Sequence, residues 1–210
     1  MANWCNNTLE IQGDIVNLLN IVRRLERARE DEDDKDKGMF EILVGPVPTG
    51  STDDDYYGTT EVENVKDHYY MSGDIYGQLI RFQFETRWSP PDKFVKKLSE
   101  IFNVKTELYY EEMGADFCGK VWYTNGELVD SEEYTYLEGL YRFEEYEMFW
   151  GEAHWRIESY MECEDDVTED GTEHIEENFG FVSEEDKEEL LSIYKNEYGN
   201  YYGCEVEQTN

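Results

Sequence analysis

The polar and apolar positions near the N-terminus predict a strand, a helix and a second strand. Residues 8–12 alternate between polar and apolar side chains, which is the period of a strand with one buried face. Apolar residues then recur at helical spacing over Ile15–Leu25, and Asp14 can cap this helix. The apolar run Met39–Val44 predicts the second strand, and a polar, irregular segment follows over residues 49–75.

The pattern further along the chain predicts two more strands, a second helix and a hairpin. Alternation over residues 79–85 and 104–111 is typical of strands. Residues 89–102 predict a helix that opens on a proline pair, which the first helical turn tolerates. Asn125-Gly126 marks the turn of the hairpin. The order of elements is β-α-β-β-α-β, so we expect an α+β fold, a ferredoxin-like sandwich with an added hairpin.

The second half of the chain has a less regular pattern. Tyr141–Glu162 is aromatic and acidic, which predicts strands with a sharp turn at Gly151. Ser183 can cap a helix that ends near Tyr198, and Tyr201–Glu207 predicts a returning strand. We therefore expect a smaller acidic α+β region after the first domain.

Acidic residues are concentrated in this second half. The chain of 210 residues has 51 Asp and Glu against 18 Lys and Arg, a net charge of −33. Residues 1–110 have a net charge of −8, whereas residues 111–210 have a net charge of −25. We expect a ferredoxin-like domain over residues 1–130, and an acidic α+β extension or second small domain over residues 131–210. Asp130–Glu133 suits a linker between them or the start of a helix.

This charge excludes two classes of partner. Affinity for a nucleic-acid backbone depends on Lys and Arg, so we expect no direct binding of nucleic acid, and adsorption to an anionic membrane is excluded for the same reason.

No apolar run reaches the roughly 18 residues of a spanning helix, and the first residues show no secretory signal. The 17 Tyr, 10 Phe and 5 Trp can still form a core. We therefore expect a folded protein of the host cell cytoplasm.

Common catalytic and metal-binding patterns are missing from the sequence. The four cysteines lack the two-residue spacing of a zinc site, which predicts reduced thiols, and the three histidines share no ligand spacing. The carboxylates are too numerous for a catalytic pair to be chosen. We therefore expect no enzyme and no cofactor. The residues concerned are Cys5, Cys118, Cys163, Cys204, His68, His154 and His174.

One segment has part of the pattern of a calcium-binding loop. Asp166, Asp170 and Glu177 fill the first, fifth and twelfth ligand positions, and Gly171 stands at the sharp turn. Thr168 replaces the usual carboxylate at the third position. Chance matches are common in so acidic a segment, so this is a weak calcium candidate and we expect no metal site.

Three segments resemble a known family. They are Met1–Gly13 (MANWCNNTLEIQG), Phe84–Pro91 (FETRWSPP) and Tyr109–Gly119 (YYEEMGADFCG). In this order they resemble the YubB-like family of phage- and plasmid-encoded proteins, over roughly residues 1–125. The chain departs from the family at Tyr57–Glu61, where the family has an aromatic-Gly-Thr-Lys-Trp stretch. The resemblance implies a ferredoxin-like domain and a mobile-element origin, and it implies no catalytic residues.

The acidic second half indicates mimicry of a nucleic acid. Carboxylates on a rigid scaffold can imitate the phosphates of a duplex, and interleaved Tyr and Trp can anchor an interface. We predict a phage- or plasmid-encoded inhibitor that blocks the basic groove of a nucleic-acid-binding protein of host defence, a CRISPR effector or a restriction enzyme. The predicted partner-binding residues are Glu144, Glu145, Glu147, Glu162, Glu164, Asp165, Asp166, Glu169, Asp170, Glu173, Glu176, Glu177, Glu184, Glu185 and Asp186.

Two alternatives to mimicry stay open. One is a small metal- or ligand-binding enzyme of unknown substrate. The other is an assembly module whose charge serves only solubility. Salt distinguishes this module from a mimic, because only contacts between opposite charges weaken steeply as ionic strength rises.

Overall fold

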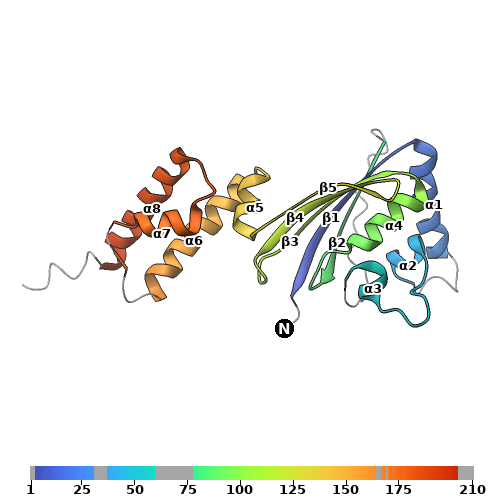
Figure 1. The fold of residues 1–210 in the computed structure, drawn as a ribbon, viewed down its shortest axis with the longest axis horizontal. Coiled ribbons are helices and arrows are strands. Elements are labelled where there is room, and N and C mark those ends of the chain that lie inside the picture. Colours follow the sequence, from blue (N-terminus) through green and yellow to red (C-terminus); the bar gives the residue numbers. More distant parts are fainter. Residues whose placement is uncertain (1–2, 31–36, 60–77, 164–166, 169, 203–210) are drawn as a thin grey trace, which may run out of the picture. The chain divides into compact units, whose positions relative to one another are not determined.

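The chain divides into two compact units, Met1–Tyr134 and Thr135–Asn210. The computed structural model describes residues 3–30, 37–59, 78–163, 167–168 and 170–202 (Figure 1). The division lies at the end of the last strand, whereas the sequence pattern placed it after residue 130.

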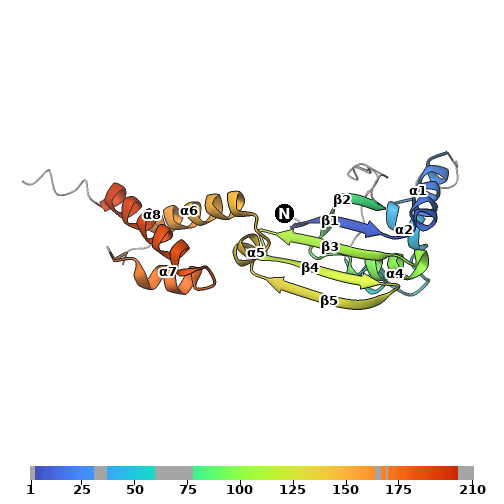
Figure 2. The same ribbon diagram turned by 90° about the horizontal axis from the view of Figure 1, so that it is seen from above.

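The first unit is built on a five-stranded antiparallel sheet with the strand order β2-β1-β3-β4-β5 (Figure 2). β1 pairs with both β2 and β3, so segments far apart in the sequence lie side by side. The strands are β1 Trp4–Gln12, β2 Leu79–Arg87, β3 Lys105–Glu112, β4 Phe117–Thr124 and β5 Glu127–Tyr134.

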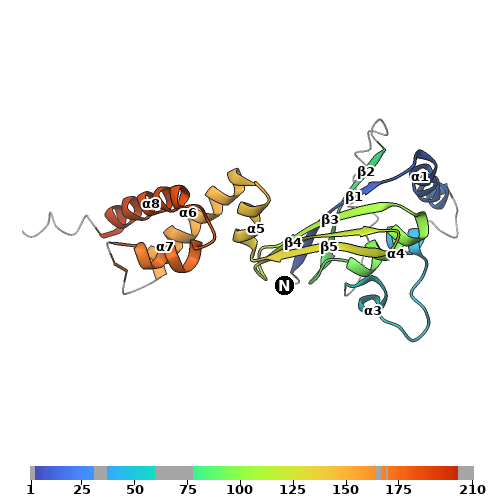
Figure 3. The same cartoon turned by 45° about the horizontal axis from the view of Figure 1, so that its top comes forward.

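Helices cover one face of this sheet. Alternate residues of β1 and β2 are buried, as expected for strands with one covered face. The helices lie on the same side of the sheet (Figure 1, Figure 3), with α4 packed against β3 and β4 and with α1 packed against α2 and α4. The helices are α1 Ile15–Glu30, α2 Met39–Val44, α3 Asp53–Tyr57 and α4 Asp92–Phe102.

The α+β class and most predicted elements of this unit are confirmed, but residues 39–44 form helix α2 and not a strand. Periodicity cannot assign so short an apolar run to either type of element. Its buried residues form two pairs at i, i+4 spacing, Met39 with Leu43 and Phe40 with Val44, which is the spacing of one helix face. The segment around α3, which was predicted to be irregular, also includes one short helix.

Phe40 joins α2 to the rest of the core. Its ring stacks on Phe94 of α4, with 3.9 Å between the ring centroids and 16° between the planes. It also makes edge contacts with Phe84 of β2 and Tyr57 of α3, each at 5.5 Å. One aromatic side chain therefore contacts the sheet and two helices.

The hairpin between β4 and β5 is confirmed, but its second strand is longer than predicted. Asn125 and Gly126 both have positive φ, 53° and 81°, as a two-residue I′ turn requires. β5 continues to Tyr134, so Asp130–Glu133 belongs to the sheet and not to a linker or helix. Most side chains of β5 are exposed, so this edge strand has no apolar alternation that the sequence could reveal.

The described part of the second unit is helical, so the expected strands over Tyr141–Glu162 are wrong. The buried residues of α6 are spaced four apart, at Phe149, Ala153, Ile157 and Met161, and they form one apolar stripe. The strand propensity of aromatic residues is a weaker constraint than the burial of such a stripe. The helices are α5 Tyr136–Arg142, α6 Tyr146–Cys163, α7 Thr172–Phe179 and α8 Glu184–Tyr202.

The N-terminus of α8 is confirmed and its predicted end is wrong. The Ser183 hydroxyl accepts a hydrogen bond from the backbone N–H of Asp186 at 3.2 Å, as an N-cap does. The helix continues through Gly199 to Tyr202, whose hydroxyl donates to the Met161 carbonyl at 3.0 Å. A contact with α6 thus outweighs the helix-breaking tendency of glycine. Residues 203–207 of the strand predicted here lie outside the described residues.

Phe40→Ala should destabilise the first unit by roughly 3–5 kcal/mol, because it removes a buried ring and leaves a cavity. Urea unfolding, followed by the NMR signals of the sheet amides, measures the change. Met113→Ala, at an exposed side chain of the same unit, should change stability by no more than about 0.5 kcal/mol. A Phe40 variant as stable as this control would contradict the packing role of α2.

Candidate functional site

The second unit has a large excess of negative charge. Residues 135–210 contain 23 Asp and Glu and 4 Lys and Arg, a net charge of −19. α6 packs against α5 and α8, and α7 packs against α8, around buried residues such as Phe149, Phe179 and Tyr194. Apolar residues thus fill the interior, and carboxylates lie on the outer faces of α6, α7 and α8. We call these exposed carboxylates the acidic helical surface.

The structure describes 11 of the 15 predicted partner-binding residues. Ten are exposed and Asp186 is half-buried. They are distributed over the turn before α6, both ends of α6, the segment before α7, α7 itself and the start of α8. The exposed residues are Glu144, Glu145, Glu147, Glu162, Asp170, Glu173, Glu176, Glu177, Glu184 and Glu185, and the residues outside the described part are Glu164, Asp165, Asp166 and Glu169.

Basic residues of this unit pair with carboxylates inside it. Arg142 and Arg156 each pair with the glutamate four residues earlier on the same helix, at 3.1 and 3.0 Å. Lys187 of α8 lies 3.0 Å from Glu184 and 3.1 Å from Glu176 of α7, and these hydrogen bonds raise the pKa of Lys187. The 4 Lys and Arg of the unit are too few to pair with its 23 Asp and Glu.

Helix N-termini explain part of the acidic surface. Glu147, Glu173 and Glu184 lie in the first turns of α6, α7 and α8, where the helix dipole favours a carboxylate. Asp186 accepts hydrogen bonds from the hydroxyls of Ser183 and Tyr141, both at 2.6 Å, and these bonds lower the pKa of its carboxyl. Asp186 therefore has a structural role in the α8 cap.

Other carboxylates lie where they do not stabilise the helices. Glu162 is in the last turn of α6, and Glu177 is in the last turn of α7, where the dipole disfavours negative charge. The last turns of these helices contain no basic residue. On α8, the exposed Glu189 lies beyond the first turn and four residues after Glu185, a spacing at which like charges repel each other. Helix stability therefore does not account for this part of the surface.

The partial calcium motif does not form a twelve-residue loop in the described part of the chain. Asp166 lies outside this part, Asp170 precedes α7, and Glu177 lies within α7. Because α7 begins at Thr172, the second half of the motif is helical. A calcium loop of this type needs ligands from that half in loop geometry.

None of the described cysteines is part of a disulfide bond, which agrees with the prediction of reduced thiols. Cys5 and Cys118 are buried and Cys163 is exposed, and Cys204 lies outside the described residues. Burial raises the pKa of the Cys5 thiol to about 12. A thiol with such a pKa stays protonated near neutral pH and cannot act as a nucleophile.

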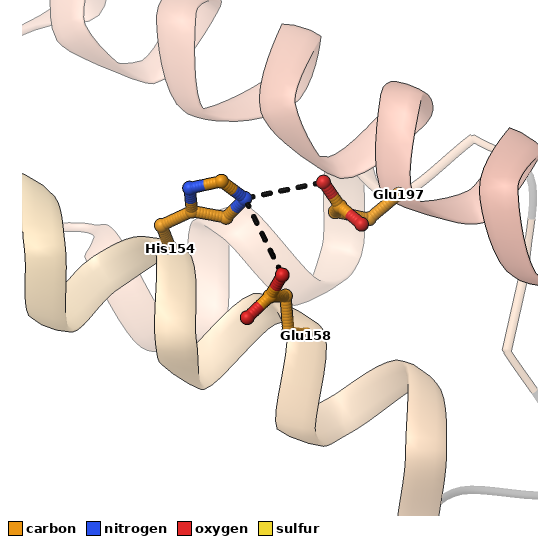
Figure 4. A group of neighbouring side chains, drawn as sticks. All are labelled: His154, Glu158 and Glu197. Carbon is orange, nitrogen blue, oxygen red and sulfur yellow. Dashed lines mark hydrogen bonds and ion pairs between the residues drawn. The ribbon is translucent and has the colours of Figure 1, made fainter.

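One histidine and two glutamates form a cluster between α6 and α8 (Figure 4). His154 and Glu158 lie one turn apart on α6, and Glu197 comes from α8. Nε2 of His154 is 3.1 Å from Oε1 of Glu197 and 3.9 Å from Oε1 of Glu158. The expected strand over Tyr141–Glu162 concealed this cluster, because a four-residue spacing brings side chains together only on a helix.

His174 lies outside this cluster and packs on aromatic residues of the second unit. Its ring packs against Tyr160 and Tyr194, at 4.0 and 5.5 Å between the ring centroids. The Asn178 side-chain amide lies 3.3 Å from Nδ1, while Nε2 is buried without a hydrogen-bond partner among the described residues. Burial lowers the pKa of His174, although Glu177 acts in the opposite direction.

The first unit has a basic surface of its own. Arg23, Arg24 and Arg27 of α1 line a hollow of about 640 Å³ together with Phe102. The guanidinium of Arg24 lies 6.0 Å from the centroid of the Phe102 ring. This hollow thus differs in charge from the acidic helical surface of the second unit.

Known proteins match parts of this chain. Residues 67–152 match the model of a family described as "Ferredoxin-like domain in Api92-like protein". The uncharacterized protein YubB of Escherichia coli (strain K12) is 32% identical over 77 residues, which are 36% of this chain and 41% of that protein. A crystal structure of protein api92 from Yersinia pseudotuberculosis matches 64% of this chain and 98% of that chain, with 13% identity and a TM-score of 0.42.

The expected ferredoxin-like, α+β fold class is confirmed by the family match together with the antiparallel sheet and its helices. The similarity to YubB agrees with the family resemblance seen in the sequence. Among the helices of the described residues, none has the length and apolar character needed to cross a membrane.

His174→Phe should make the stability of the second unit less sensitive to acid. The lowered pKa of His174 means that the unfolded chain takes up this proton more readily, so wild-type stability falls as pH decreases below about 6.5. The phenylalanine ring has no proton to gain. Thermal unfolding of both proteins between pH 7.5 and pH 5 measures how the stability of each changes with pH. Because both proteins contain the same carboxylates, the difference between the two profiles isolates the contribution of His174. Parallel pH profiles would contradict this interpretation.

Proposed function

We propose that the protein inhibits a nucleic-acid-binding enzyme of host defence by occupying its basic groove with the acidic helical surface. The main supporting observation is that carboxylates such as Glu177, in the last turn of α7, and Glu189, four residues after Glu185 on α8, stay exposed at positions where they do not stabilise their helices. Self-repulsion on such a surface lowers stability. Binding of a basic partner would neutralise these charges and relieve the repulsion between them.

The helical scaffold suits this role because it holds carboxylates in defined positions. Glu173, Glu176 and Glu177 share one exposed side of α7 through their i, i+3 and i, i+4 spacing. Lys187 of α8 connects the two helices through its ion pair with Glu176 of α7. Charges fixed in this way lose little freedom on binding, and a complementary potential raises the rate of association.

Exposed apolar side chains accompany the acidic residues of α6. Tyr146, Met148 and Trp155 are 48%, 47% and 59% exposed, and Glu147 lies between the first two in the sequence. Tyr, Trp and Met are enriched in protein interfaces, and Tyr and Trp are also among the residues that contribute most to the binding energy. Their presence favours a protein partner over a surface that serves only solubility.

The proposed target is a CRISPR effector in the first place and a restriction enzyme in the second. Both bind nucleic acid through Lys- and Arg-rich channels, which a strongly acidic surface complements. Encoding by a phage or plasmid and action in the host cytoplasm are part of this proposal.

Reversal of charge on α7 should weaken inhibition. A Glu173→Lys/Glu177→Lys variant should need at least about tenfold more protein to inhibit DNA cleavage by a purified CRISPR effector complex or restriction enzyme, because two attractive contacts become repulsive. The matched control is Glu127→Lys/Asp130→Lys, which makes the same change of charge at exposed positions of β5. The control should inhibit like the wild-type protein.

Inhibition should also depend on salt. Between about 50 and 200 mM salt, the affinity for the target should fall by about tenfold or more, as contacts to phosphate do over this range. Isothermal titration at four salt concentrations measures the slope. A flat salt dependence, or equal loss of inhibition in the α7 variant and the β5 control, would contradict mimicry.

A further inference from the structure

The cluster of His154, Glu158 and Glu197 has the composition of a metal site, and we propose that it binds a divalent transition metal ion, zinc in the first place. The three side chains converge from two helices onto one point (Figure 4). This site does not depend on the proposed inhibitor function, because it would serve the second unit whether or not that unit has a partner.

The distances between the potential ligand atoms fit a small ion. Zinc binds imidazole nitrogen and carboxylate oxygen at about 2.0–2.2 Å in tetrahedral geometry, which separates neighbouring ligand atoms by roughly 3.3–3.5 Å. Nε2 of His154 lies 3.1 Å from Glu197 Oε1 and 3.9 Å from Glu158 Oε1. The three ligand atoms all lie within 4.8 Å of one another. Side-chain rotations that shorten the longest possible separation from 4.8 Å to about 3.5 Å bring the three atoms into this range.

The donor set indicates which class of ion fits. Imidazole nitrogen favours zinc and similar transition metals, whereas calcium and magnesium are bound through oxygen. Two carboxylates and one neutral imidazole together balance the charge of a divalent ion. Three protein ligands leave a fourth tetrahedral position for water, as in zinc sites with an open position. The histidine therefore distinguishes this cluster from the many carboxylates elsewhere on the surface.

The position of the cluster makes it accessible and gives binding a structural effect. The side chains of His154 and Glu158 are 47% and 46% exposed, so an ion can reach them from solvent, while Glu197 is 14% exposed and held in place. The negative charge of the unit raises the local concentration of cations. An ion bound here would connect α6 to α8, two helices that already pack together, and would stabilise the unit through linkage.

Calorimetric titration of the metal-free full-length protein with zinc chloride tests the site. We expect one zinc ion per chain at this cluster and a higher melting temperature of the second unit. NMR should show the shift of the His154 imidazole signals and no shift of those of His174, which is packed between tyrosines. Calcium and magnesium should not cause these changes, because they lack a preference for imidazole.

Three variants locate the binding. His154→Ala and Glu197→Gln should each weaken zinc binding by at least about tenfold. Loss of a residue that only hydrogen-bonds to a metal ligand already lowers metal affinity by about this factor, so loss of a ligand should lower it at least as much. Glu188→Gln is the matched control, because it removes the same charge from an exposed position of α8 outside the cluster. Its zinc affinity should equal that of the wild-type protein. Circular dichroism confirms that each variant is folded, and Glu197→Gln preserves the shape of the side chain.

Two results would overturn the proposal. Equal weakening in Glu197→Gln and Glu188→Gln would show diffuse attraction of cations to the acidic surface. Absence of a shift in the His154 signals on addition of zinc would show that His154 and Glu197 form an ordinary ion pair.

Discussion

Burial of the apolar stripe of α6 is the interaction on which the acidic unit depends. Phe149, Ala153, Ile157 and Met161 are fully or almost fully buried, and α6 packs against α5 and α8. The mutual repulsion of the carboxylates opposes this compact state. Apolar burial offsets that repulsion at roughly 25 cal/mol per Å², so the unit can keep a dense negative charge on its surface and remain folded.

The repulsion between carboxylates also bears on the role of the basic side chains in this unit. Arg156 and Lys187 pair with carboxylates of their own unit, and pairs of this kind contribute little when exposed. Arg156 connects two turns of α6, and Lys187 connects α8 to α7. These pairs leave most of the negative charge of the unit uncompensated. The remaining charge is available to a basic partner, and the cluster around His154 provides a separate position for a metal ion.

The sequence predicts the first unit better than the second for physical reasons. Alternation in β1 and β2 is clear because one face of each strand is buried. Prediction from this pattern fails for Met39–Val44, because six residues are too few to show whether the period is that of a helix or a strand. It also fails to give the full length of β5, because the side chains of β5 are mostly exposed. In α6, aromatic residues on all sides hide a stripe that only the packing of α5 and α8 makes visible. Ten of the eleven predicted acidic residues that the structure describes are exposed. The role of Asp186 in a cap and the His154 cluster depend on contacts between helices, which the sequence pattern does not reveal.

The central claim is that the acidic helical surface and a nucleic acid compete for one basic groove. Its most direct test is the displacement of a fluorescently labelled DNA duplex from a purified CRISPR effector complex, followed by anisotropy at increasing concentrations of the protein. Competition predicts complete displacement, with a midpoint that rises in proportion to the concentration of unlabelled DNA. A stable complex that contains the effector, the DNA and the protein together would contradict the claim.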